Sequence, residues 1–256
     1  MKIGICTSID QIELVQRIGF DYIEPAVVGI AQMNKKEYEE VLTKVDESKI
    51  GCEVFNILFP GEIRLTGPNV NHESIREYLV KAFDRIAKLG AKAVVFGSGG
   101  ARRIPEDLDP KDGWKDLVET ARVVGEVASQ YNIIIAMEPL NKSETNILNS
   151  VSEGISFVKE VDHTNIRLLA DFYHMRVEDE SMDILKETNS DILVHTHIAK
   201  GDGRYFPICK DEDIYSEFFY GLKEIAYESR VSIEGRTDNF EEDAAKALEV
   251  LRELAK

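Results

Sequence analysis

The sequence has few cysteines, a shortage of basic residues and no long apolar run. Its three cysteines, Cys6, Cys52 and Cys209, are far apart and form no Cys-x-x-Cys pair. We therefore expect reduced thiols rather than a disulfide framework. The 31 basic residues are outnumbered by 47 acidic ones, which gives a formal net charge of -16. A surface of that sign repels phosphate backbones and anionic lipid headgroups, so we expect no nucleic-acid partner and no membrane partner.

No apolar stretch approaches the roughly 20 residues that a membrane-spanning helix requires. From Lys2 the chain passes directly into a short strand pattern, without the apolar core of a signal peptide. Together with the free cysteines, these absences predict a cytoplasmic protein. What the sequence does have is a hydrophobic fraction of 43%, which is enough for one large core. We predict that residues 1–256 form a single domain.

Short apolar runs alternate with longer amphipathic stretches along the whole chain. The predicted strands are Ile3–Thr7, Tyr22–Val27, Cys52–Phe55, Ala93–Phe96, Ile133–Met137, Ile166–Ala170, Ile192–His197 and Val231–Ile233. The predicted helices are Ile12–Ile18, Lys35–Ser48, Ser74–Leu89, Trp114–Gln130, Ser152–Val161, Met182–Thr188, Ile214–Tyr227 and Glu241–Leu254. Continuously apolar runs are typical of parallel strands that are buried on both faces. This order predicts an α/β fold, a single (β/α)8 TIM barrel, with a doubly wound open sheet as the alternative.

Four consecutive predicted strands end in a titratable side chain, namely Glu138, Asp171, His197 and Glu234. In a closed parallel barrel these ends face one mouth, where three carboxylates repel one another unless a cation holds them. Taken singly, each carboxylate is explained by a helix cap or an exposed position. As a set they predict one bound divalent metal ion. The oxygen-rich ligands favour Mn²⁺, our first choice, or Mg²⁺, with Co²⁺ or Zn²⁺ as further options.

Other polar residues lie on or after the same strands. His195 is two residues before His197, so both imidazoles should point into the barrel, with His195 one layer lower. Glu24, on the second strand, either accepts hydrogen bonds from the pocket or pairs with a buried base. Asn56 and Cys6 follow the third and first strands and are candidates to line the mouth, although a turn asparagine and a small buried thiol also account for them.

One glycine-rich loop, FGSGGARR at 96–103, directly follows a strand. Its backbone amides and the side chains of Arg102 and Arg103 can cradle a phosphate, although the loop matches neither the P-loop nor the dinucleotide fingerprint. The alternative is that the glycines only let the chain turn close to the barrel mouth.

Four segments together resemble the xylose isomerase-like sugar isomerases and epimerases. They are MEPLN at 137–141, ADFYHM at 170–175, HTHI at 195–198 and SIEGR at 232–236. The similarity is greatest to the subgroup of the ketose 3-epimerases, such as D-tagatose 3-epimerase, and hydroxypyruvate isomerase. It extends over the whole chain in strand order and is most specific in the second half. The resemblance implies a TIM barrel with one divalent ion bound by Glu138, Asp171, His197 and Glu234.

The same resemblance implies substrate contacts. His174, three residues after the aspartate, matches a histidine that binds substrate oxygens, and Glu144, six residues after the first glutamate, matches a glutamate near the pocket. Arg204 lies about one position away from the usual place of a substrate-binding arginine after the His-x-His motif. Asn56 and Arg102 are further substrate-binding candidates.

We therefore predict a divalent-metal-dependent ketose epimerase whose partner is a small sugar or sugar phosphate. A metal chelated by the ketose oxygens makes the adjacent C–H acidic and stabilises the enediolate, while Glu138 and Glu234 approach opposite faces to remove and return the proton. Return of the proton to the neighbouring carbon gives an aldose–ketose isomerase instead. We also consider a metal-dependent polyol dehydratase and a non-catalytic sugar-binding barrel. Five histidines are too few for the zinc cluster of a related endonuclease. Homo-oligomerisation stays open, because no surface pattern indicates it.

Overall fold

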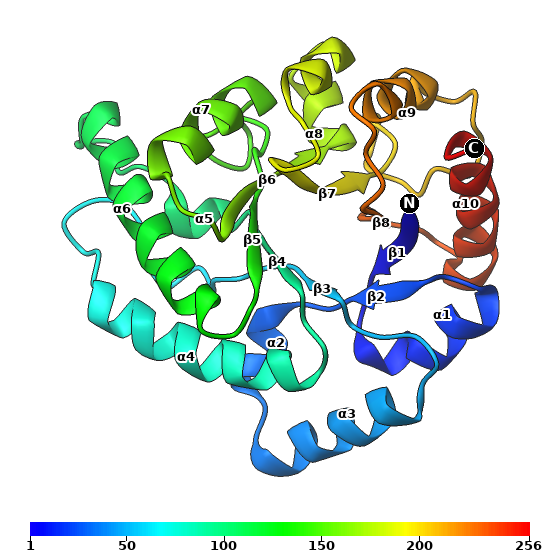
Figure 1. The fold of residues 1–256 in the computed structure, drawn as a ribbon, viewed down its shortest axis with the longest axis horizontal. Helices are drawn as coiled ribbons and strands as arrows, with labels where there is room; N and C mark the ends of the chain where they lie inside the picture. The colour runs from blue at the N-terminus through cyan, green and yellow to red at the C-terminus, as the bar shows by residue number, and fades with distance from the viewer.

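The computed structural model describes residues 1–256 and shows parallel strands at the centre with helices around them (Figure 1). The strands are β1 (Lys2–Cys6), β2 (Tyr22–Glu24), β3 (Val54–Phe55), β4 (Ala93–Phe96), β5 (Ile134–Met137), β6 (Ile166–Asp171), β7 (Leu193–Ile198) and β8 (Arg230–Ile233). The α helices are α1 (Ile12–Ile18), α2 (Val27–Gln32), α3 (Lys35–Glu47), α4 (His72–Lys88), α5 (Gly99–Arg102), α6 (Pro110–Ser129), α7 (Val151–Val161), α8 (Phe172–Val177), α9 (Tyr215–Glu224) and α10 (Phe240–Leu254). Two 3-10 helices are η1 (Ile9–Gln11) and η2 (Met182–Glu187). No helix combines the length and apolarity needed to cross a bilayer.

The strands form one sheet in the order β2-β1-β8-β7-β6-β5-β4-β3. Isolated parallel bridges, Tyr22 with Gly51 and Ala26 with Asn56, join β2 to the chain on either side of β3 and nearly close the barrel. All the strand pairs are parallel, as expected when each strand is followed by a helix on the outside. The predicted TIM barrel is confirmed.

The structure differs from the predicted elements at three short helices. The second strand ends at Glu24 rather than at Val27, because Pro25 follows and Val27 already begins α2. Two more unpredicted helices, α5 and α8, directly follow strands and are too short for a clear apolar period. The predicted helix 182–188 is the 3-10 helix η2. Helices α2, α5 and α8 lie beside strand ends at the mouth of the barrel, whereas η2 lies next to α9 on the outside.

Apolar side chains fill the space between strands and helices, and a second, smaller cluster fills the barrel itself. The inner cluster consists of Tyr22, Val54, Ala93, Val95, Ala136 and Leu169. Gly4 on β1 is paired with Tyr22, and a Cβ at Gly4 would lie 2.3 Å from the tyrosine ring. Glycine at this position therefore allows the ring to occupy the barrel interior. The interior is packed with side chains and is not a channel.

Ion pairs join several strands at the opposite end of the barrel from the mouth. Glu53, just before β3, lies 2.6 Å from Arg230 Nη2 at the start of β8 and 2.5 Å from Lys2 Nζ at the start of β1. Burial raises the pKa of Glu53, but Lys2 and Arg230 outweigh burial and lower it to about 2. The glutamate therefore ties three strands together across the base of the barrel.

We expect Glu53→Gln to lower the free energy of unfolding by about 1–2 kcal/mol at pH 7, because the pairs are only partly shielded from water. The folded pKa of Glu53 is below its ordinary value of 4.5, so the stabilisation is complete above that pH and is lost as the pH falls toward about 2. Urea unfolding at several pH values measures the difference. Glu62→Gln, at an exposed position, changes the net charge equally and should have no such effect. Equal destabilisation by both variants would contradict the prediction.

Candidate metal centre

Glu138, Asp171, His197 and Glu234 converge at the C-terminal end of the strands. Glu138 follows β5, Asp171 ends β6, His197 lies on β7 and Glu234 follows β8. One candidate ligand atom from each residue lies within 4.8 Å of those of the other three. The structure thus brings together the four residues that the sequence predicts as ligands, and a candidate Glu/Asp/His metal site exists at the mouth.

Burial and neighbouring charges together set the protonation of this group. Burial raises the pKa of Asp171 to about 6, although Arg204 and His197 oppose the shift. Burial also raises the pKa of Glu138. The same effect on Glu234 is outweighed by His197 and Arg204, which bring the pKa of that carboxyl down to about 2. The mouth therefore concentrates negative charge that nearby cations already partly neutralise.

The donor atoms at the mouth fit a divalent cation. The Oδ1 atom of Asp171 accepts a hydrogen bond from the backbone N–H of Tyr173 at 2.7 Å, whereas its buried Oδ2 atom has no hydrogen-bond partner. A buried carboxylate oxygen without a partner is costly, and a cation ligated by that oxygen would remove the cost. The Nδ1 atom of His197 lies 3.0 Å from Glu138 Oε1 and 3.2 Å from Glu234 Oε2. Three carboxylates and one imidazole form a hard ligand set that suits Mn²⁺ or Mg²⁺.

His174 points a hydrogen-bond donor toward this centre. Its Nδ1 atom accepts a hydrogen bond from the backbone N–H of Asn141 at 3.2 Å, and the side-chain Nδ2 of Asn141 lies 2.9 Å away. Burial lowers the pKa of His174 and so favours the neutral ring, whose proton must then be on Nε2. That buried atom has no hydrogen-bond partner and lies 3.5 Å from Asp171 Oδ2. His174 can therefore donate to an oxygen of a bound molecule, in keeping with its predicted role.

Arg204 and Glu144 form the rim of the mouth. The Nη2 atom of Arg204 lies 2.5 Å from Glu234 Oε2, and its Nη1 atom lies 3.3 Å from Glu144 Oε1. The guanidinium also stacks on the ring of Tyr173, 4.8 Å from its centroid. Despite its displaced position in the sequence, Arg204 is thus brought to the mouth, and its backbone is left-handed (φ 55°).

Asn56 is also at the mouth, but its contact is with a carboxylate of the candidate centre. Its Nδ2 atom donates to Glu234 Oε1 at 3.2 Å, and the side chain is buried. The bridge between Ala26 and Asn56 holds this residue next to β2. Asn56 orients Glu234, and the prediction that it contacts substrate stays untested.

Arg102 is not placed where the sequence predicts it. The side chain is fully buried, and its guanidinium donates to the main-chain carbonyls of Glu138 at 2.8 Å, Phe96 at 3.3 Å and Leu148 at 3.4 Å. Burial lowers its pKa to about 10, so the side chain remains charged at neutral pH. The prediction of a substrate or phosphate contact for Arg102 is therefore wrong. Helix α5 turns the side chain beneath the loop, where it holds the end of β5.

The glycine-rich loop makes room for Glu138. A Cβ at Gly97 would lie 2.3 Å from Glu138 Oε2, far closer than a Cβ atom approaches a non-bonded neighbour, so the carboxylate would have to move. The interpretation in which the glycines let the chain turn close to the barrel mouth is thus supported at Gly97.

We expect Gly97→Ala to displace the Glu138 carboxylate and to lower the catalytic rate by about 10–100-fold, because small misplacements of reacting groups are costly. Steady-state kinetics with the substrate found by the assay proposed below measures this effect. Gly100→Ala, three residues along the same loop, is the matched control, because a Cβ there has nothing within 4 Å. Similar rates for the two variants would contradict the prediction.

The sequence alone predicts no role for Asn141 or Gly97. Asn141 is 1% exposed and contacts both His174 and Glu144, so it orients two predicted substrate contacts at once. The MEPLN segment could have indicated a role for Asn141, because an asparagine there closely follows the end of a predicted strand. Nothing in the sequence distinguishes Gly97 from the other glycines of its loop.

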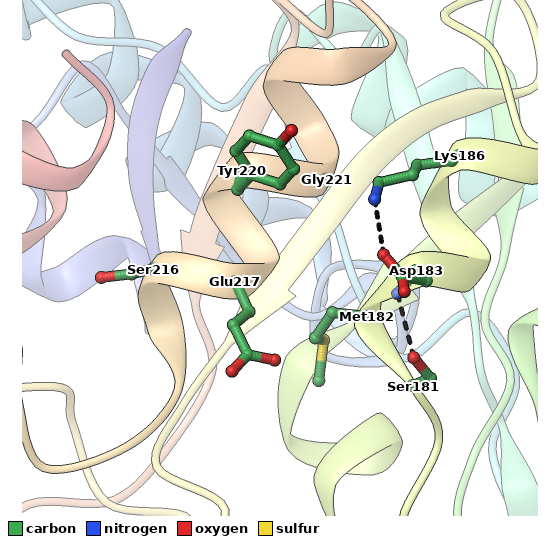
Figure 2. Close-up of a pocket in the computed structure, with 8 residues that line it drawn as sticks. All are labelled: Ser181, Met182, Asp183, Lys186, Ser216, Glu217, Tyr220 and Gly221. Atoms are coloured by element: carbon green, nitrogen blue, oxygen red, sulfur yellow. Dashed lines mark hydrogen bonds and ion pairs between the residues drawn. The ribbon is translucent and has the colours of Figure 1, made fainter.

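A surface hollow of about 340 Å³ lies on the outside of the barrel, between η2 and α9 (Figure 2). Two of its charged groups pair with each other: Lys186 lies 2.6 Å from Asp183, and it also lies 5.2 Å from the centroid of the Tyr220 ring. None of the grouped carboxylate and histidine ligands lies in this hollow. The chemistry of the molecule is therefore concentrated at the mouth.

Comparison with known proteins agrees with this arrangement. The sequence model of the xylose isomerase-like TIM barrel family matches residues 12–254. The chain belongs to this family. A crystal structure of D-psicose 3-epimerase with D-tagatose from Clostridium cellulolyticum has a TM-score of 0.88 at 22% identity and covers 100% of both chains. That likeness establishes the fold of this family member.

Two characterised relatives of this xylose isomerase-like protein are carbohydrate epimerases. D-psicose 3-epimerase of Ruminiclostridium cellulolyticum is 27% identical over 196 residues, covering 74% of this chain and 65% of the relative. The 3-dehydro-D-guloside 4-epimerase of Escherichia coli is 28% identical over 162 residues, covering 61% of each protein. The match thus spans less than two thirds of the length of these two relatives.

Proposed function

We propose that this protein is a divalent-metal-dependent ketose epimerase that transfers a proton between two glutamates. The observation that carries the proposal is the convergence of Glu138 and Glu234, from the ends of β5 and β8, with Asp171 and His197. Epimerase activity among the relatives supports this assignment. A divalent ion held by the four side chains would act as a Lewis acid that makes the C–H beside a ketose carbonyl acidic.

The two glutamates are held in different environments. Glu138 hydrogen-bonds through Oε1 to His197 at 3.0 Å, and its Oε2 atom faces Gly97. Glu234 is held through Oε1 by Asn56 and through Oε2 by Arg204. In the proposed reaction one glutamate removes the proton from C3 of the ketose and the other delivers a proton to the opposite face. The two exchange roles for the reverse reaction.

The remaining mouth residues orient the sugar. His174 donates from Nε2 to a substrate hydroxyl, since that atom is buried and has no other partner. Glu144, with its side chain 38% exposed, accepts from a hydroxyl farther out on the rim. These contacts fix which carbon lies between Glu138 and Glu234, and positioning of this kind supplies a large part of an enzymatic rate enhancement.

We propose an unphosphorylated ketose rather than a ketose phosphate as the substrate. The guanidinium of Arg204 is surrounded by Glu234, Glu144 and Asp171, so its charge is already balanced. Arg102, the other arginine suggested for a phosphate, is buried against carbonyl oxygens. A neutral sugar suits a mouth in which the positive charge is already paired.

The test is solvent proton exchange. The Mn²⁺-loaded protein is incubated in D₂O with a panel of free and phosphorylated ketoses, and NMR identifies the carbon that gains deuterium. Deuterium at C3 with inversion of that centre is the expected result. Deuterium at C1 or C2 would instead identify an aldose–ketose isomerase, and the absence of exchange with every sugar would refute proton-transfer chemistry on ketoses.

A further inference from the structure

Glu24 is a carboxylate buried inside the barrel, outside the group of four residues at the mouth. It lies on β2 and is 1% exposed. A carboxylate that is removed from water is costly unless several donors bind it. Its partners in the barrel therefore show what it stabilises.

Three donors surround the two oxygens of Glu24. Its Oε1 atom lies 2.9 Å from His197 Nε2, and its Oε2 atom lies 2.9 Å from His195 Nε2 and 2.5 Å from Ser232 Oγ. Ser232 Oγ is in turn 2.7 Å from the hydroxyl of Tyr22. The two imidazoles come from β7, separated from β2 in the sheet by β1 and β8, so this cluster links β2 to β7 through the interior.

The contact with Glu24 determines which face His197 presents to the mouth. An ionised carboxylate only accepts hydrogen bonds, so Nε2 keeps its hydrogen, and a bound metal ion would replace the hydrogen that Nδ1 shares with Glu138. The lone pair is then on Nδ1, the atom that lies 3.0 Å from Glu138 Oε1 and 3.2 Å from Glu234 Oε2. Glu24 thus holds His197 in the tautomer and ring orientation that a metal ligand requires.

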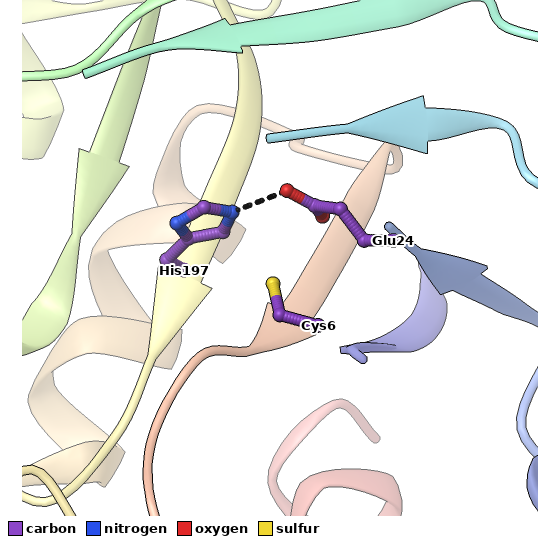
Figure 3. Close-up of side chains that lie close together, drawn as sticks. All are labelled: Cys6, Glu24 and His197. Carbon is purple, nitrogen blue, oxygen red and sulfur yellow. Dashed lines mark hydrogen bonds and ion pairs between the residues drawn. The ribbon is translucent and has the colours of Figure 1, made fainter. Parts of the chain in front are cut away.

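Cys6 also approaches this cluster, and Cys6, Glu24 and His197 form a second close group of candidate ligands (Figure 3). The imidazole belongs to both groups, since Nδ1 faces the mouth and Nε2 faces Glu24. The dashed contact in Figure 3 already uses the Nε2 atom, and the other oxygen of Glu24 is used by His195 and Ser232. The inner group therefore supports the outer one and does not form a separate ion site.

We propose that Glu24 is a positioning residue that sets the metal affinity of this protein through His197. The inference rests on the metal centre of the proposed function. Glu24 never touches the ion or the sugar. It fixes the imidazole, and its negative charge increases the electron density that the ring offers through Nδ1. A carboxylate on β2 thereby controls a ligand on β7.

The test is the affinity for Mn²⁺, measured by calorimetry on the metal-free protein. Glu24→Gln keeps the shape of the side chain, but an amide cannot accept hydrogen bonds on both sides and carries no charge. We expect it to weaken Mn²⁺ binding by about 10–100-fold. Ser232→Ala removes one donor to Glu24 and leaves the contact with His197 in place, so it should remain within about 3-fold of the wild type.

Two further measurements keep the inference falsifiable. In the Zn²⁺-loaded wild type, ¹⁵N NMR should show a slowly exchanging proton on His197 Nε2 that is lost in Glu24→Gln, and a wild type without it would overturn the proposal. If Glu24→Gln fails to fold, Glu24→Asp is the second variant. It retains the negative charge, but its shorter side chain moves the carboxylate away from His197, and it should weaken Mn²⁺ binding by about 5-fold or more.

The outcomes separate this inference from the proposed function. Wild-type affinity in the folded Glu24 variants would overturn the role of Glu24 and leave the metal centre intact. A wild type that binds no Mn²⁺, Mg²⁺, Co²⁺ or Zn²⁺ would overturn the metal centre itself, together with this inference. Weak binding in the Glu24 variants beside normal binding in Ser232→Ala would support both.

Discussion

Glu138→Gln is expected to reduce epimerisation by about 10²–10⁴-fold, because the amide cannot accept a proton from carbon. The amide oxygen remains able to ligate a metal, so the loss should appear in kcat at saturating Mn²⁺. Burial raises the pKa of Glu138, and a more basic carboxylate is the better proton acceptor. Rates of C3 inversion, measured by NMR for both epimers, quantify the effect.

The partner variant Glu234→Gln distinguishes a mechanism that uses two catalytic bases from one that uses a single base. With two bases on opposite faces, each single variant loses inversion but keeps solvent exchange on the epimer whose C3 proton faces the surviving glutamate. Glu138→Gln and Glu234→Gln should therefore exchange deuterium into opposite epimers. Loss of exchange on the same epimer in both variants, or normal inversion in either, would contradict the two-glutamate mechanism.

Asp171→Asn is expected to raise the dissociation constant for Mn²⁺ by about 10²-fold or more, because the ligand set loses a charge. The Oδ2 atom of Asp171 is buried without a hydrogen-bond partner, so the carboxylate has no structural need for both of its oxygens. Its Oδ1 atom caps α8 through Tyr173, and an asparagine oxygen can retain that bond. Calorimetric titration of the metal-free protein is the direct measurement.

The matched control for Asp171→Asn is Glu144→Gln. Both variants remove one negative charge near the mouth, but Glu144 contacts Asn141 and Arg204 on the rim and does not belong to the candidate centre. We expect Glu144→Gln to raise KM and to keep Mn²⁺ affinity within about 3-fold of the wild type. An equal loss of Mn²⁺ affinity in both variants would show that the total negative charge of the mouth determines metal binding, and that Asp171 is not itself a ligand.

The barrel and the ends of its strands were predictable because a buried apolar run marks each strand. The end of β5 illustrates this point: Ile134–Met137 is apolar throughout, and Glu138 follows at once. In a parallel barrel all such ends face the same side, so the order of the elements was enough to bring Glu138, Asp171, His197 and Glu234 together. No knowledge of the side-chain packing was needed.

The side-chain contacts of the loops were not predictable in the same way. Arg102 and Arg204 are both arginines in segments that follow strands, yet one is buried against carbonyl oxygens and the other faces the carboxylates. The difference arises from the short helix α5 and from the left-handed backbone at Arg204, and neither has a periodic signal in the sequence. The environment of Glu24 depends on packing across the barrel, over 173 positions in the sequence, so the sequence alone could not resolve it.

The four residues of the candidate centre stand at strand ends, whereas His174, Glu144 and Arg204 belong to the segments that follow the strands. The first set is fixed by the hydrogen-bonded framework, and the second set is free to change with the length and sequence of the loops. If the proposed function is correct, we expect substitution within those loops to change which sugar binds without disturbing the four residues of the candidate centre. This division between fixed strand ends and variable loops is consistent with relatives that are named for different sugars and are 27% and 28% identical to this chain over the aligned residues.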